Sequence, residues 1–273
     1  MADPPFILTT PKRDVRWLKA MWYGPFGGGK THLAATAEDC KHFRDVLFID
    51  VESGDITLQE QWPDMVVAQP HDFASFARVY DMLTIHHRIR KAGGPEEKKR
   101  LIDLENLYRP DHQVTEPHYF NTVVIDSLSE VQGLLHLDIM DIKLGETKLD
   151  AEMADFGWDQ FDISINRMRF VVRSIRDLPM NVIIVCGEQE KNDNGRIRLS
   201  PNLQGKLSYE LPGFMDVVGR LEASEPNEKG AILRRLYLSN GKNWKAKSRL
   251  STLKANYLDD PTMESIAQAA KLV

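Results

Sequence analysis

A glycine-rich turn near the start of the chain constrains its fold more than any other part of the sequence. The turn, Gly24–Thr31, reads GPFGGGKT and satisfies the pattern G-x-x-x-x-G-K-[ST] at every defined position. It follows a short apolar run, Leu18–Tyr23, and leads into an alanine-rich stretch, Lys30–Glu38. Strand, tight turn and helix in this order are the context in which the pattern binds phosphate. The sequence therefore predicts a nucleotide-binding P-loop within an α/β protein.

The chemistry of a P-loop explains why these residue types occur at this spacing. Backbone N–H groups of the glycines converge on phosphate oxygens, and the N-terminus of the following helix adds a partial positive charge. Lys30 is expected to reach the β- and γ-phosphates of ATP, and the Thr31 hydroxyl to bind Mg²⁺. The residues predicted to contact the nucleotide are Gly24, Pro25, Phe26, Gly27, Gly28, Gly29, Lys30, Thr31 and, at the helix start, His32.

An acidic residue at the end of a second apolar run supplies the other part of such a site. Thr122–Ile125 reads TVVI and predicts a buried strand, which Asp126 ends. A carboxylate in this place holds Mg²⁺, although it also suits the N-cap of a following helix. Because a P-loop lies upstream, we favour a metal site formed by Thr31 and Asp126, with ATP and Mg²⁺ as cofactors.

The remaining apolar runs alternate with helical patterns, which predicts a mostly parallel sheet with helices on both faces. Further strands are predicted at Asp45–Val51, Met65–Ala68 and Asn181–Cys186, and helices at Asp72–Ile89, Leu128–Leu144 and Phe161–Leu178. Shorter alternating segments near the C-terminus predict antiparallel strands at Val217–Glu222, Ala231–Ser239 and Trp244–Arg249.

One stretch departs from this alternation and is predicted to leave the core. Residues 91–117 contain Gly93-Gly94-Pro95, a run of mixed charge and two further prolines. We interpret them as a mobile insertion with a helix around Leu101–Leu107. The length of the chain allows one large α/β domain or two small ones, and we expect a single domain over residues 1–273.

Composition excludes several classes of protein. Hydrophobic residues make up 42% and charged residues 27% of the chain, which is typical of a globular domain and not of a disordered one. The two cysteines, Cys40 and Cys186, support neither a disulfide framework nor a zinc site. No run approaches the ~20 apolar residues of a membrane span. We therefore expect a cytoplasmic protein without membrane association.

The catalytic carboxylate is not where many P-loop ATPases place it. Those enzymes carry a glutamate directly after the strand-ending aspartate, but here that position is Ser127, which cannot act as a base. Glu52 directly follows the apolar run Phe48–Val51, which ends the strand expected to lie beside the P-loop strand. A carboxylate there can orient water toward the γ-phosphate, so Glu52 is the predicted catalytic residue.

Three stretches in order, GPFGGGKTHL, FIDVES and VVIDSLSEV, resemble the RecA pattern of a P-loop, a strand-ending glutamate and a strand-ending aspartate followed by serine. The landmarks extend over Met21–Leu221, and the resemblance is closest to short phage ATPases that act as single-strand annealing proteins or recombinases. It implies a RecA-like P-loop ATPase core that forms rings or filaments and hydrolyses ATP between subunits. It also implies that Lys30, Thr31 and Asp126 hold ATP and Mg²⁺ while Glu52 is catalytic.

The resemblance further implies a polar sensor of the γ-phosphate after the strand Asn181–Cys186. Gln189 has the chemistry of such a sensor, whereas Glu188 has the nearer spacing. We select Gln189, with a loop of exposed polar residues as the alternative for either position.

In RecA-like proteins, two loops that face the central axis of the ring or filament contact DNA. The matching segments are Gly145–Trp158 and Glu190–Lys206, of which the first is mainly acidic. Phe156 and Trp158 there would either stack on bases or be buried. The second is predicted to be a mobile loop that contacts DNA phosphates through Lys191, Arg196, Arg198 and Lys206.

A basic block stands out in a chain whose net charge is −5. Lys229–Leu258 contains eight basic residues and no acidic one. The resemblance implies that such late residues reach the γ-phosphate of a neighbouring subunit, and our candidates are Lys247 and Arg249. The alternative is a solvated edge strand whose lysines resist aggregation.

Together with these features, the resemblance implies an ATP-dependent recombination protein that binds single-stranded DNA and promotes annealing or strand exchange. Its partners would be single-stranded DNA, further copies of itself and a single-strand-binding protein, in the bacterial host cytoplasm if the chain is phage-encoded. The alternatives are another P-loop ATPase or kinase, such as a helicase loader or a small-molecule phosphotransferase, and a nucleotide-dependent regulatory switch.

Overall fold

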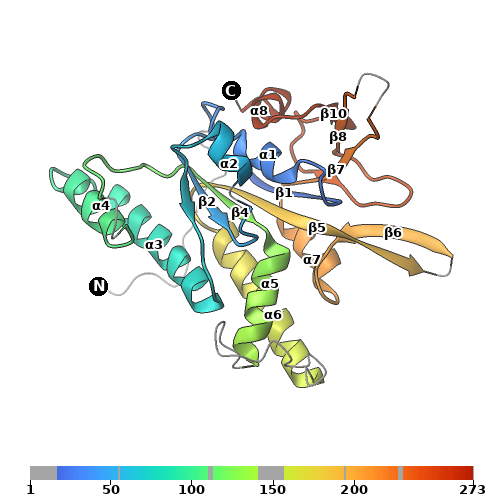
Figure 1. Cartoon of the computed structure of the whole chain (residues 1–273), viewed down its shortest axis with the longest axis horizontal. Coiled ribbons are helices and arrows are strands. Elements are labelled where there is room, and N and C mark those ends of the chain that lie inside the picture. Colours follow the sequence, from blue (N-terminus) through green and yellow to red (C-terminus); the bar gives the residue numbers. More distant parts are fainter. Residues whose placement is uncertain are drawn as a thin grey trace.

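One sheet forms the centre of the molecule (Figure 1). The computed structural model describes residues 17–54, 56–109, 113–140, 157–193, 195–226 and 230–272. Within these ranges the sheet has ten strands, eight of them in the order β10-β8-β7-β1-β5-β4-β2-β3, while β6 pairs with β5 and β9 with β7. The strands are β1 (Lys19–Gly24), β2 (Val46–Asp50), β3 (Val66–Ala68), β4 (Thr122–Asp126), β5 (Asn181–Asp193), β6 (Arg196–Pro201), β7 (Val217–Ala223), β8 (Arg234–Tyr237), β9 (Lys247–Ser248) and β10 (Tyr257–Asp259).

The direction of the strands confirms the predicted fold class. All pairs from β7 through β1, β5, β4 and β2 to β3 are parallel, and the pairs of β8, β9 and β10 are antiparallel. The P-loop strand β1 therefore lies inside the sheet between β5 and β7, and β5 separates it from β4, which carries the predicted metal ligand.

Alternation along the strands directs side chains into two cores, one on each face of the sheet. On β1, Met21 and Tyr23 pack on one face and Ala20 and Trp22 on the other. Helices cover both faces, as predicted. The first face packs against α3 (Phe73–Ala92), α5 (Leu128–Ile139), α6 (Trp158–Arg176) and α7 (Leu207–Phe214), and the second against α1 (Lys30–Ala35), α2 (Ile56–Gln61) and α8 (Met263–Ala270).

The predicted insertion contains the helix α4 (Glu97–Asn106), which packs beside α3. Leu101 and Glu105 are the buried residues of α4. The Glu105 carboxylate accepts a hydrogen bond from the backbone N–H of His118 (3.1 Å) and lies 2.6 Å from its ring Nδ1. These contacts attach α4 and the segment after it to the rest of the domain, while mobility of residues 91–117 stays a prediction.

Two predictions fall partly outside the described ranges. The helix expected over Leu128–Leu144 is α5, which ends at Ile139. Residues 141–156 lie outside the described ranges, and they include most of the first predicted DNA loop, with Phe156. Trp158 begins α6 and its side chain is exposed.

The second predicted DNA loop is wrong in its secondary structure. β5 continues past Cys186 to Asp193 and pairs antiparallel with β6 from Glu188↔Pro201 to Asp193↔Arg196. In place of the predicted mobile loop, the structure has a β-hairpin, which Figure 1 shows projecting from the sheet. The Asn194-Gly195 dipeptide between two runs of alternating residues is the sequence signal for this hairpin.

None of the helices in the described part of the chain combines the length and the apolar character needed to cross a membrane.

Candidate functional site

The P-loop connects the buried end of β1 to the start of α1, as the sequence predicts. Gly24 ends β1 so close to β7 that a Cβ there would lie 2.1 Å from the Leu221 carbonyl oxygen. Gly29 is the N-cap of α1 with φ 87° and ψ 22°, a left-handed conformation that other residues adopt only with strain. Glycine is therefore required at these two positions by packing and by backbone conformation.

Lys30 is held over the loop that precedes it. Its Nζ donates a hydrogen bond to the Pro25 carbonyl (2.8 Å) and lies 5.9 Å from the centre of the exposed Phe26 ring. Burial lowers the pKa of Lys30, while the Asp126 and Glu52 carboxylates act in the opposite direction. An ammonium group on this loop suits the predicted contact with β- and γ-phosphates.

Thr31 and Asp126 meet at the carboxyl end of the sheet. The Thr31 hydroxyl hydrogen-bonds to the buried Asp126 carboxyl, whose pKa is raised to about 7 by burial and by the nearby Glu52 and Asp50 carboxylates. Asp50 faces Asp126 in the register of β2 and β4, and its buried Oδ2 has no hydrogen-bond partner. A carboxylate oxygen without a donor and a carboxyl whose ionised form lacks solvation both fit a nearby cation.

These residues fit Mg²⁺ only together with a nucleotide. In the described part of the chain, no group of three or more His, Cys, Asp or Glu side chains could hold a metal ion alone. Mg²⁺ keeps several waters and takes one or two protein ligands plus phosphate oxygens. Thr31 and Asp126 would provide the protein ligands, and the ion would neutralise charge on the phosphates.

Glu52 follows β2 at the same edge of the sheet. Its exposed carboxylate contributes to the raised pKa of Asp126. The pKa of Glu130, in the first turn of α5, is raised mainly by burial of that side chain and further by the Glu52 carboxylate. Glu52 thus lies within electrostatic range of the predicted metal ligand, as a catalytic carboxylate should.

The predicted sensor Gln189 has a structural contact. Its amide nitrogen donates hydrogen bonds to the carbonyls of Pro201 (2.8 Å) and Leu203 (3.0 Å), which fasten the base of the hairpin. The His32 side chain contacts the end of α2 and the residue after it: its Nε2 lies 3.1 Å from Gln61 Oε1, and its ring packs edge-on against Trp62.

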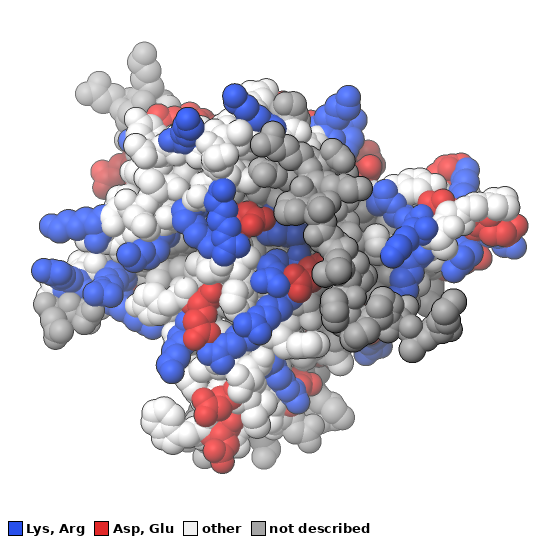
Figure 2. Space-filling model, turned by 180° about the vertical axis from the view of Figure 1, so that it is seen from behind, with Lys and Arg blue, Asp and Glu red and all other residues white. Residues whose placement is uncertain are grey.

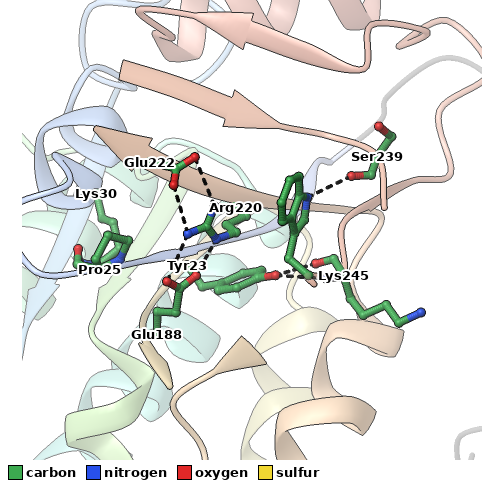
Figure 3. A network of polar contacts seen from close by, with 9 residues as sticks. Tyr23, Pro25, Lys30, Glu188, Arg220, Glu222, Ser239 and Lys245 are labelled. Carbon is green, nitrogen blue, oxygen red and sulfur yellow. Dashed lines mark hydrogen bonds and ion pairs between the residues drawn. The ribbon is translucent and has the colours of Figure 1, made fainter. Parts of the chain in front are cut away.

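Glu188, the other position considered for the sensor, forms a buried ion pair. Arg220 donates from Nε to Glu188 Oε2 (2.6 Å) and from Nη2 to Oε1 (3.2 Å), and it also pairs with Glu222. Figure 3 shows Arg220 between the two glutamates, with Tyr23 beside Glu188. The Tyr23 hydroxyl donates to the Lys245 carbonyl (2.7 Å) and accepts from its N–H (3.2 Å), so this network connects the residue before the P-loop to the 241–245 turn.

The hairpin and the 241–245 turn enclose a cavity of about 690 Å³, which we call the hairpin groove. The Leu199 N–H donates to the Asn243 carbonyl (2.7 Å) and holds the two walls together. Cationic and aromatic side chains line the groove: Arg196, Arg198, Lys242, Lys245, Tyr209 and Trp244. Figure 2 shows basic side chains standing out on the hairpin side of the molecule, at the left, with few acidic ones among them.

Two of the four predicted DNA-binding residues, Arg196 and Arg198, line this groove. Lys191 lies on β5 opposite Arg198, and Lys206 precedes α7. Sequence reasoning missed Lys242 and Lys245 as groove residues because only the fold brings their turn against the hairpin.

Lys247 and Arg249 lie away from the P-loop of their own subunit. Both donate to the Gly213 carbonyl, at 3.1 and 2.6 Å. Lys247 pairs with Val218 near the amino end of β1, whereas the P-loop follows its carboxyl end. Their predicted role toward a neighbouring subunit stays a prediction.

Sequence reasoning also missed Asp50, Glu130 and Arg220. Arg220 had a recognisable signal, because an arginine inside the apolar strand Val217–Ala223 requires a buried acidic partner. Asp50 and Glu130 carry no distinguishing sequence pattern, and only the meeting of β2, β4 and α5 brings them to the site.

A protein-family model and several solved structures each match most of the chain. A family model described as an AAA domain matches residues 16–250. Similar solved structures include a RadB recombinase (14% identity, TM-score 0.36, 82% of this chain and 80% of that one). They also include the KaiC-like protein PH0186 from Pyrococcus horikoshii OT3 (13%, 0.38, 80% and 76%) and the flagellar accessory protein FlaH from Methanocaldococcus jannaschii (9%, 0.36, 80% and 76%). No curated protein matches the sequence.

Proposed function

The chain belongs to the AAA domain family and is a P-loop ATPase with a RecA-like α/β fold, and we propose that it uses ATP to bind single-stranded DNA in recombination. The reaction served is annealing or strand exchange, in an oligomer with ATP between subunits. A phage origin and a single-strand-binding protein as partner belong to the same proposal.

The hairpin groove is the observation that carries this proposal. Sequence-independent binding of single strands needs cations for the phosphates and aromatic faces for the bases, and the groove lining supplies both. None of its described lining residues is acidic. Lys191 pairs with Arg198 in the register of the hairpin, so both arms carry basic side chains next to the groove.

The position of the groove supports coupling to ATP. Tyr23 immediately precedes the P-loop and holds the backbone of Lys245, a groove residue. Glu188 begins the hairpin and is fixed by Arg220, whose guanidinium lies 5.2 Å from the centre of the Trp244 ring. A change at the P-loop would reach both walls of the groove through these contacts.

In the hydrolysis step, the residues of the site have separate tasks. ATP would supply the electrophilic γ-phosphorus, and Mg²⁺ would neutralise charge on its phosphate oxygens. The loop amides and Lys30 would bind the phosphates, and Thr31 with Asp126 would hold the ion. Glu52 would orient the attacking water and accept its proton while the bond between the γ-phosphorus and the ADP oxygen breaks; its place directly after β2, which pairs with the strand that carries Asp126, supports this role.

The test measures binding of a fluorescent oligo(dT) strand and ATP turnover with and without it. The variant Lys242→Glu/Lys245→Glu reverses two groove charges, and Lys99→Glu/Arg100→Glu makes the same charge change on exposed positions of α4. We expect the groove variant to bind at least about tenfold more weakly with a shallower salt dependence, because each lost phosphate contact lowers the slope by about 1. The α4 variant should stay within about twofold of wild type.

The outcomes separate the alternatives. Equal loss in both variants would mean that net charge, and not the groove, attracts DNA. Turnover by a monomer that ignores DNA would favour a phosphotransferase, and tight nucleotide binding with negligible turnover would favour a regulatory switch. Particle size measured with ATP and DNA tests the oligomer directly.

A further inference from the structure

Arg234, the first residue of β8, lies against the P-loop of its own subunit. A Cβ on Gly29 would be 2.6 Å from Arg234 Nε and 3.0 Å from its Cδ, so the arginine side chain touches the loop at the N-cap of α1. The backbone of Arg234 is fixed on both sides by Asp260. Its N–H donates to Asp260 Oδ1 (3.0 Å), and its carbonyl accepts from the Asp260 N–H (2.6 Å).

The guanidinium of Arg234 lacks the partners that arginines normally have. Its Nε is buried and makes no hydrogen bond. Among the residues that the structure describes, no carboxylate forms an ion pair with it. The adjacent Arg235 behaves differently, since it donates to both oxygens of Asp259 (2.6 and 3.1 Å). A half-buried cation with a free donor is therefore available to an anionic ligand.

The anion that this position fits is a phosphate group. Gly29 belongs to the loop whose amides bind phosphate, and a guanidinium is a planar donor suited to phosphate oxygens. We propose that Arg234 contacts the phosphate chain of the nucleotide bound by its own subunit. One member of the basic block Lys229–Leu258 thus acts within the subunit, in contrast to the role predicted for Lys247 and Arg249.

The test measures affinity and not turnover. Calorimetric titration of the full chain with ADP and with inorganic tripolyphosphate is compared for wild type, Arg234→Gln and Arg235→Gln. Both variants remove one positive charge from the same strand. We expect Arg234→Gln to weaken both ligands about tenfold or more, as loss of a charge-assisted hydrogen bond does, and Arg235→Gln to stay within about twofold.

Three results would overturn the proposal. Wild-type affinity in Arg234→Gln would show that Arg234 does not contact the phosphates. Equal losses of affinity in the two variants would show that Arg234 acts only through long-range electrostatic attraction. Loss for ADP with unchanged tripolyphosphate affinity places the contact on the base or sugar. If Arg234→Gln does not fold, Arg234→Lys keeps the charge and serves instead. Its ADP affinity should fall about three- to tenfold, because an ammonium cannot reproduce the guanidinium fork, and wild-type affinity would contradict the proposal.

Discussion

Arg220 on β7 reaches past the P-loop strand to pair with Glu188 on β5, with N···O distances of 2.6 and 3.2 Å. The two residues flank β1 on opposite sides, because β1 pairs with β5 and with β7. Their side chains are 6% and 10% exposed, so the charges are largely removed from water. The pair therefore fixes both neighbours of the strand that leads into the nucleotide-binding loop.

Removing Arg220 should be costly. Arg220→Met leaves Glu188 buried without its partner, and breaking a buried pair in this way costs about 3–5 kcal/mol in the free energy of unfolding. Urea unfolding measures the loss. The control Arg235→Met breaks the more exposed pair with Asp259 and should leave the urea midpoint near that of wild type. If Arg220→Met unfolds at the wild-type midpoint, the pair does not hold the three strands.

Asp126 should make the nucleotide-free protein sensitive to pH. Its folded pKa of about 7 exceeds the usual value of 3.8, so between these pH values the folded chain binds a proton that the unfolded chain has released. Stability from this group is therefore lost as pH rises from about 4 to 7. At pH 8 without ligand, we expect Asp126→Asn to melt at least about 3 °C above wild type.

The difference should narrow toward pH 4, where both side chains are neutral, and the variant should no longer bind ADP more tightly when Mg²⁺ is added. A constant difference in melting temperature across this pH range would show that the Asp126 carboxyl does not have a raised pKa.

Glu52→Gln should separate chemistry from binding. Replacing the carboxylate by an amide removes the proton acceptor but leaves the P-loop intact, so ATP turnover should fall about 100-fold or more while ADP affinity changes less than about threefold. Glu60→Gln, on an exposed position of α2, is the matched control and should retain wild-type turnover. Undiminished turnover in Glu52→Gln would assign the catalytic carboxylate elsewhere.

Lys247 and Arg249 allow a test of ATP hydrolysis between subunits. If Lys247 completes the site of a neighbour, Lys247→Ala and Lys30→Ala are each inactive, but a mixture regains some turnover because one kind of interface is then intact. The measurement is DNA-stimulated ATP turnover against mixing ratio. Full turnover by Lys247→Ala alone would end the proposal. Its Nζ contact with Gly213 within the subunit would then be its role.

Two glycines in different surroundings, Gly24 at the end of β1 and Gly133 on α5, should respond in opposite ways to substitution by alanine. Gly24→Ala places a methyl group 2.1 Å from the Leu221 carbonyl and must separate β1 from β7, which should destabilise the fold by about 2 kcal/mol or more. Gly133→Ala on α5 meets nothing within 4 Å and should stabilise by about 0.5–1 kcal/mol. Chemical unfolding of both variants checks this, and equal shifts would contradict the close approach.

The sequence predicts those parts of the molecule that depend on local pattern. The P-loop, the strand ended by Asp126 and the alternation of strands and helices follow from apolar runs and glycine spacing, and the structure confirms them. The hairpin is the part where the prediction is wrong: the resemblance implies a loop there, and Asn192, Asn194 and Gly195 suggest flexibility, whereas Asn194-Gly195 also favours a tight turn between two strands.

Contacts between distant segments could not be predicted in the same way. Arg234 touches Gly29, and Tyr23 binds Lys245, across about 200 residues of sequence or more, and neither pair has a motif. Such contacts depend on the order of β1, β7 and β8 in the sheet, which one sequence does not specify.

The length of β5 has a mechanical consequence. Its first part lies between β1 and β4, the strands that carry the P-loop and Asp126, and its last six residues, Glu188–Asp193, form one arm of the hairpin. At about 3.3 Å per residue, this arm extends roughly 20 Å from the sheet. A strand of this shape is a lever whose pivot is the nucleotide site. If single-stranded DNA is pulled through the hairpin groove, as the proposed function allows, we expect the load on the hairpin to be transmitted along β5 to the nucleotide site and to change the rate of ATP turnover.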